Sequence, residues 1–128
     1  MRLLLDPHAF IWWDADPERL SKKAYDACMD GSNSLHLSYA SILVMQIKIQ
    51  TGKLKLRVSL AELIRTNQRE NGLILETIDL PDILHLDTLP FHHRDPFDRM
   101  IIAQTMQRGY HVVTVDGAFA DYEVSILW

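Results

Sequence analysis

The feature of this sequence that most constrains its fold is an alternation of short apolar runs, typical of strands, with longer helical patterns. Such alternation is typical of α/β proteins, in which helices cover the faces of a parallel sheet. Strands are predicted at residues 2–5, 35–38, 73–78, 111–115 and 124–128, and helices at 7–13, 21–29, 39–50, 59–67, 79–89 and 96–107. We therefore expect a single α/β domain over residues 1–128.

The predicted helix at 39–50 is apolar around much of its circumference, through Ile42, Leu43, Val44, Met45, Ile47 and Ile49. A helix of this kind needs cover on more than one side. The core or another subunit could provide that cover.

The composition favours a soluble protein of a reducing compartment. Hydrophobic residues make up 48% and charged residues 23% of the chain, as in ordinary globular proteins. Cys28 is the only cysteine, so no internal disulfide can form. The leucine run at residues 3–5 is too short for a signal peptide, and no apolar run is long enough to span a membrane. We expect a cytoplasmic protein that does not associate with membranes.

The net charge of −4 argues mildly against a nucleic acid partner, because generic nucleic acid binders are basic. The distribution of charge matters more than its sum. One basic cluster comprises Lys48, Lys53, Lys55 and Arg57, and a second comprises His92, His93, Arg94 and Arg99. A group of carboxylates would make the net charge negative even in a nuclease, so charge alone does not decide.

Three or four aspartates are predicted to converge at one edge of the sheet. Asp6 and Asp116 each directly follow a predicted strand, and ligands of parallel sheets bind beyond the carboxyl ends of the strands. The helix that begins at Pro96 runs antiparallel to the strand after it, so its first turn, with Asp95 and Asp98, should lie near the same edge. Each acid also has a structural explanation. Asp95 is a favourable helix N-cap, and Asp6 could cap the first short helix in the same way. Asp98 could interact favourably with the dipole of its helix, and Asp116 could be an ordinary turn residue.

Clustered carboxylates repel one another and are tolerated best when a cation neutralises them. Oxygen ligands without a cysteine or histidine signature favour Mg²⁺ or Mn²⁺ over zinc. The pair His92-His93 is interpreted as solvated or as a phosphate contact rather than a ligand pair. A carboxylate-bound Mg²⁺ suits phosphodiester cleavage. The chain lacks a dinucleotide fingerprint, a phosphate loop and a nucleophile elbow.

Three segments resemble PIN-domain proteins of the VapC toxin type. Residues 3–9 (LLLDPHA) are similar to the opening strand and first acid of that family, residues 92–99 (HHRDPFDR) to a segment of one VapC subgroup, and residues 113–116 (VTVD) to the late strand with its acid. The resemblance extends over nearly the whole chain. It implies a three-layer α/β/α fold with a five-stranded parallel sheet.

The resemblance also implies a function and a set of site residues. It implies a Mg²⁺-dependent endoribonuclease toxin that acts on an RNA substrate, forms a homodimer and is neutralised by a VapB-type antitoxin. Carried over by position, Asp6, Asp98 and Asp116 would be the catalytic and metal-binding acids. Asp95 and Thr114 would support the site, Thr114 by hydrogen bonding.

The central helix departs from the family pattern. The family has S-x-W-E in this helix, whereas this chain has Ser41, Ile42, Leu43 and Val44, so valine stands where a further catalytic glutamate is usual. Valine cannot bind metal or accept a proton. Gln46 lies about 200° around the helix from residue 44 and is a poor substitute. Activity could therefore be weakened.

The departure leaves a second hypothesis open, in which the chain is a catalytically inactive copy that still binds an antitoxin. Val44 favours this hypothesis, and the retained Asp6, Asp98 and Asp116 oppose it. A receiver-like signalling domain also has acids at strand ends. It would need an acidic neighbour for Asp6 and a lysine after a late strand, and neither is present.

Overall fold

The computed structural model describes residues 1–128 and contains one five-stranded sheet in which every strand pair is parallel. The strands are β1 (Arg2–Leu5), β2 (Ser34–Ser38), β3 (Ile74–Glu76), β4 (His111–Val113) and β5 (Ser125–Leu127), in the spatial order β3-β2-β1-β4-β5. β1 is central, with Leu4 opposite His36 on one side and Val112 on the other. The predicted five-stranded parallel sheet is confirmed.

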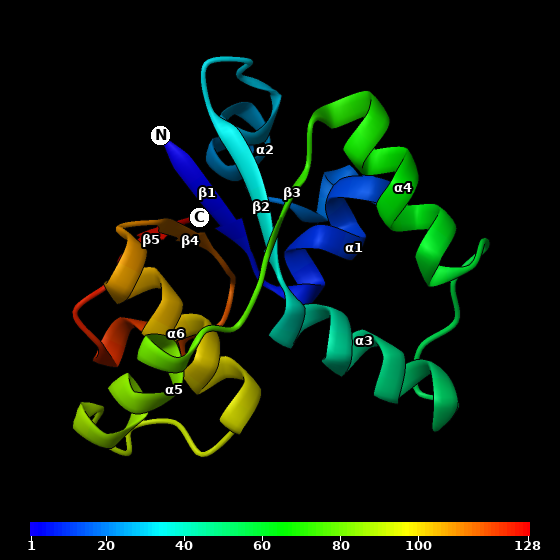
Figure 1. The fold of residues 1–128 in the computed structure, drawn as a ribbon. Helices are drawn as coiled ribbons and strands as arrows, with labels where there is room; N and C mark the ends of the chain where they lie inside the picture. Colours follow the sequence, from blue (N-terminus) through cyan, green and yellow to red (C-terminus); the bar gives the residue numbers. More distant parts are fainter.

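Helices cover both faces of this sheet (Figure 1). They are α1 (Pro7–Ala15), α2 (Lys22–Met29), α3 (Tyr39–Gln50), α4 (Leu60–Asn71), α5 (Leu80–His85) and α6 (Pro96–Arg108), with 3-10 turns η1 (Pro17–Arg19), η2 (Leu86–Thr88) and η3 (Gly117–Asp121). None of them is both long and apolar enough to cross a lipid bilayer.

The core has two halves because successive side chains of β1 point to opposite faces of the sheet. Leu3 and Leu5 pack with residues of α1, α2 and α4. Leu4 packs with α6 and with Phe119 of η3. α3 contributes to both halves, through Met45 to the first and Ala40 to the second. The molecule is therefore a three-layer α/β/α structure with α3 at one end of the sheet.

Several element boundaries differ from the predicted ones. β4 ends at Val113 rather than at residue 115, because Thr114 leaves the strand, donates its hydroxyl to Asp6 and accepts a hydrogen bond from the backbone N–H of Asp116. α4 continues four residues beyond the predicted end, to Asn71, and stops at Gly72, which has the left-handed conformation (φ 64°) that favours glycine.

A polar cluster joins β2, β3 and α6 beneath the surface. The guanidinium of Arg108 contacts Glu76 at 2.6 Å and Asp82 at 2.5 Å, and these side chains are 18%, 16% and 3% exposed. Glu76 also contacts Nδ1 of His36 at 2.7 Å and accepts a hydrogen bond from the hydroxyl of Tyr110. Burial alone would raise the pKa of Glu76, but the hydrogen bonds and the nearby cations outweigh burial and hold that pKa below its usual value.

Candidate metal centre

Asp6 lies directly after β1 and is almost fully buried, with an exposed fraction of 4%. Its Oδ1 accepts a hydrogen bond from the backbone N–H of Ala9 (2.8 Å) and so caps α1. Its Oδ2 accepts a hydrogen bond from the hydroxyl of Thr114 (2.5 Å). Burial raises the pKa of Asp6, and these two hydrogen bonds only partly oppose the effect. A negative charge at this position is therefore costly unless a cation is near.

Asp116 follows β4 and begins η3. Its Oδ1 accepts a hydrogen bond from the backbone N–H of Ala118 (2.9 Å), and its own backbone N–H donates to Oγ1 of Thr114 (3.0 Å). Thr114 thus binds both Asp6 and Asp116, which come from neighbouring strands. The resemblance implies a supporting role by hydrogen bonding for Thr114, and these are the two hydrogen bonds that its hydroxyl makes.

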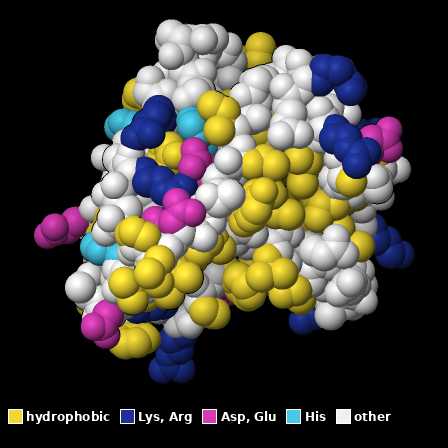
Figure 2. All heavy atoms as spheres, viewed as in Figure 1, with side chains coloured by type: hydrophobic (Ala, Val, Ile, Leu, Met, Phe, Trp, Pro, Cys, Tyr) yellow, Lys and Arg dark blue, Asp and Glu magenta, His cyan; other side chains and the backbone are white.

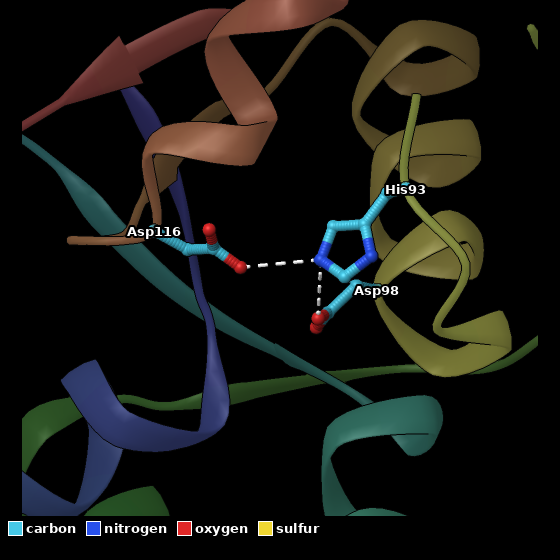
Figure 3. A group of neighbouring side chains, drawn as sticks. All are labelled: His93, Asp98 and Asp116. Atoms are coloured by element: carbon cyan, nitrogen blue, oxygen red, sulfur yellow. Dashed lines mark hydrogen bonds and ion pairs between the residues drawn. The ribbon is translucent and has the colours of Figure 1, made fainter. Parts of the chain in front are cut away.

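Asp95 and Asp98 lie at the start of α6, but their side chains make different contacts. Oδ1 of Asp95 accepts hydrogen bonds from the backbone N–H groups of Phe97 (2.8 Å) and Asp98 (3.1 Å), so Asp95 is the N-cap of the helix. The carboxylate of Asp98 faces Asp116 instead (Figure 3). Burial raises the pKa of Asp98 to about 6, with a further contribution from the charge of Asp95 and a smaller opposing one from His93.

His93 completes the group, and the sequence did not single it out as part of the site. Its Nε2 lies 3.0 Å from Oδ2 of Asp98 and 3.2 Å from Oδ2 of Asp116, between the two carboxylates (Figure 3). The possible ligand atoms of these three residues lie within 4.8 Å of one another. The neighbouring His92 is exposed and stacks edge-on against Tyr122 at 5.2 Å. The sequence cannot distinguish the two histidines, because the path of the loop decides which one points inward.

Arg99 and Tyr122 fix the loop that carries His93. Arg99 is 5% exposed and donates to the carbonyl oxygens of Pro90 (2.8 Å) and Leu86 (3.2 Å). The hydroxyl of Tyr122 accepts a hydrogen bond from the backbone N–H of His93 (3.0 Å) and donates to the same Pro90 oxygen (2.7 Å). Arg99, which the sequence groups with His92, His93 and Arg94 as a basic cluster, therefore uses its guanidinium inside the protein.

Val44 lies in the second turn of α3 and is half-buried. It shares a helix face with Ala40, one turn earlier, which packs against residues of α6. A longer acidic side chain at residue 44 would extend from the helix face that is turned toward α6. No acidic residue of α3 takes its place, because this helix contains none.

The carboxylates of Asp98 and Asp116 lie on either side of Nε2 of His93, and the buried Asp6 is joined to Asp116 through Thr114. The raised pKa values of Asp6 and Asp98 indicate that the protein alone compensates these charges incompletely. Carboxylate oxygens are the ligands that Mg²⁺ and Mn²⁺ prefer. The donor set therefore fits a hard divalent cation.

Comparisons with known proteins agree with this fold. No family model matches the chain. Ribonuclease VapC22 of Mycobacterium tuberculosis is 28% identical over 121 residues, covering 89% of this chain and 86% of the relative. Solved structures with this fold include two VapBC complexes. VapBC2 from Rickettsia felis, bound to a DNA fragment from its promoter, has a TM-score of 0.70 at 12% identity and covers 98% of this chain and 96% of its own. DNA-bound VapBC from Salmonella typhimurium has a TM-score of 0.65 at 15% identity, and the match covers 98% of this chain and 95% of the Salmonella chain.

Proposed function

We propose that this chain, which is a PIN-domain protein of the VapC type, is a metal-dependent endoribonuclease of a toxin–antitoxin system. One observation carries the proposal: the carboxylates of Asp98 and Asp116 meet at the carboxyl edge of a parallel sheet, with Asp6 buried behind them. The 28% identity to a ribonuclease of this type supports the reaction class.

In this proposal, Asp98 and Asp116 hold Mg²⁺ or Mn²⁺, and Asp6 adds negative charge from behind. A cation held by these residues would supply Lewis acidity, which would activate a water molecule and neutralise charge on the phosphate. Thr114 keeps Asp6 and Asp116 in position through its two hydrogen bonds. Asp95 acts indirectly, because as N-cap it fixes the first turn of α6 and hence the direction of Asp98.

The direct test is incubation of the purified protein with a mixed RNA pool in Mg²⁺, in Mn²⁺ and in a chelator. We expect RNA cleavage with either metal and none with the chelator. The same metals should raise Tm, because an ion that binds only the folded protein stabilises it. Cleavage that persists in the chelator would contradict the metal dependence.

The alternative function, an inactive copy that only binds an antitoxin, is favoured by one observation, the valine at residue 44. Under the proposed function, Val44→Glu should bind metal more tightly and cleave RNA faster, by about tenfold for one added charge–cation interaction of about 1.4 kcal/mol. A cleavage assay across Mg²⁺ concentrations measures both effects. Val44→Gln, of the same length but uncharged, is the matched control and should give no gain. An inactive wild type with an active Val44→Glu variant would support the alternative.

A homodimer is the second part of the proposal, and the apolar face of α3 and β3 supports it. Tyr39, Leu43, Ile47 and Ile74 are each 40–48% exposed there. Figure 2 shows apolar side chains gathered over α3 and α4. They border a groove of about 430 Å³ lined by Ile42, Leu43 and Ile64, among others. Contiguous exposed apolar surfaces of this kind usually mark sites where a protein binds a partner, because monomeric soluble proteins rarely leave them exposed to solvent.

Leu43→Lys should therefore convert the dimer to a monomer, because it puts a charge into the buried centre of the interface. Light scattering after size-exclusion chromatography measures the mass. The control is Met29→Lys, which alters an apolar side chain at the end of α2 that is 58% exposed, against 48% for Leu43, and should leave the mass unchanged. A Leu43→Lys dimer would argue against this interface.

The third part of the proposal is a VapB-type antitoxin as partner, since the solved structures with this fold include VapBC complexes. A second hollow of about 370 Å³ lies between α1, residues 55–58 and α4, and apolar side chains such as Ile11, Leu56 and Leu63 line it. Lys55 and Arg57 border it and suit an acidic rim on the partner. Co-expression with a candidate antitoxin should yield a complex that survives purification.

A further inference from the structure

We propose that His93 is a competitor of the metal ion at Asp98 and Asp116 and not one of its ligands. This inference rests on the proposed function, because it concerns the same site. The proximity of His93 to both carboxylates is compatible with either role. The hydrogen bonds of its two ring nitrogens decide between them.

Nδ1 of His93 accepts a hydrogen bond from the backbone N–H of Asp95 (3.1 Å). A ring nitrogen that accepts a hydrogen bond uses its lone pair, so the ring proton of the neutral imidazole is assigned to Nε2. Nε2 faces Oδ2 of Asp98 and Oδ2 of Asp116. His93 therefore donates one N–H to two carboxylates, which are the same oxygens that a cation would need.

A metal-binding histidine has the opposite arrangement of hydrogen bonds. A ligating nitrogen needs its lone pair, and the other ring nitrogen then carries the proton and usually donates it to a carbonyl or carboxylate oxygen. At His93 the other nitrogen faces a donor, the N–H of Asp95. Coordination through Nε2 would set a ring N–H against that backbone N–H.

Hydrogen bonds hold the backbone on both sides of the His93 ring. Asp95 is held as N-cap by its two hydrogen bonds to α6. The backbone N–H of His93 donates to Tyr122, whose hydroxyl is in turn fixed to Pro90. Because both ends of the short segment are held, rotation of the His93 side chain is the simplest way to release the carboxylates. The ring edge rests against Phe119, at 6.2 Å between ring centres, and is otherwise partly exposed.

The test is calorimetric titration of Mn²⁺, and separately of Mg²⁺, into the wild type, His93→Ala and His92→Ala. We expect His93→Ala to bind both metals about fivefold more tightly, since the lost hydrogen bonding is worth roughly 1 kcal/mol. His92→Ala, the matched control in the same loop, should bind like the wild type because His92 points away from the acids. Pulsed EPR of the wild type with Mn²⁺ should show no directly coordinated ¹⁴N nucleus, a result that needs no variant.

The other results separate the two claims. Weaker binding by His93→Ala, or a coordinated ¹⁴N in the wild type, would make His93 a ligand, overturning this inference and leaving the proposed metal site intact. Unchanged affinity in His93→Ala would also overturn it. Absence of metal binding in all three proteins would overturn the metal dependence of the proposed function together with the inference.

Discussion

Asp98→Asn should lower metal-dependent RNA cleavage by at least about 100-fold. A loss of this size is typical when one preorganised group that stabilises the charge of the transition state is removed, and in the proposed function Asp98 provides this stabilisation through the cation that it holds. The asparagine keeps the size of the side chain and a carbonyl oxygen, but it removes the charge that faces Asp116. Initial rates of cleavage at saturating Mg²⁺ measure the effect.

The same substitution should not destabilise the fold when no metal is added. Burial and the charge of Asp95 raise the pKa of Asp98 to about 6, so at pH 7 the charged carboxylate opposes folding. We expect Tm of Asp98→Asn at pH 7 to equal or exceed that of the wild type. Lost activity with an unchanged or higher Tm would separate a functional role from a structural one.

Asp95→Asn is the matched control, because asparagine caps helices as well as aspartate does. It lies three residues away, and its carboxylate binds the backbone of α6 instead of facing Asp116. We expect a loss of less than about tenfold. An equal loss in both variants would contradict the assignment of Asp98 as the acid that meets Asp116.

Arg108→Met should lower the free energy of unfolding by about 3 kcal/mol, since removing one partner leaves buried charges uncompensated. The arginine contacts Glu76 and Asp82, which are 16% and 3% exposed, so water cannot readily replace it. For a domain of this size the loss corresponds to a decrease in Tm of about 10 °C. Thermal unfolding followed by circular dichroism measures it.

The control is Arg19→Met, because Arg19 makes a surface ion pair with Asp16, and surface pairs contribute little. Its Tm should stay close to that of the wild type. A loss in Arg108→Met as small as in Arg19→Met would mean that the cluster of Glu76 and Asp82 is compensated without the arginine.

The pH dependence of stability provides a second measurement on this cluster. Because the pKa of Glu76 is lower in the folded protein than in the unfolded chain, its contribution to stability is present above the unfolded value and is lost as the pH falls through the folded value. Arg108 is among the groups that lower it. The difference in stability between the wild type and Arg108→Met should therefore shrink as the pH falls below the ordinary carboxyl range.

Elements with clear local signals were predictable from the sequence. The bounds of α3 follow from its apolar run and from Thr51-Gly52 after it, and α6 follows from Asp95-Pro96 and Gly109. The positions of Asp6 and Asp116 follow from the rule that sites lie beyond the carboxyl ends of parallel strands. These predictions needed no knowledge of distant contacts.

The remaining features depend on contacts between distant residues. β4 is shorter than predicted because the hydroxyl of Thr114 binds Asp6, a partner far away in the sequence. His93 belongs to the site because buried Arg99 and Tyr122 determine the path of its loop. No local pattern distinguishes a buried arginine that binds carbonyl oxygens from one that lies on the surface.

The hydrogen bond between Thr114 and Asp6 joins residues 108 positions apart in the sequence. A nascent chain that ends before β4 contains Asp6 and Asp98 but neither Thr114 nor Asp116. β1 then has only β2 beside it, and the second neighbour that completes its pairing has not been made. The candidate metal centre is therefore assembled late in synthesis, since it stays incomplete until the segment that carries Thr114 and Asp116 has been made.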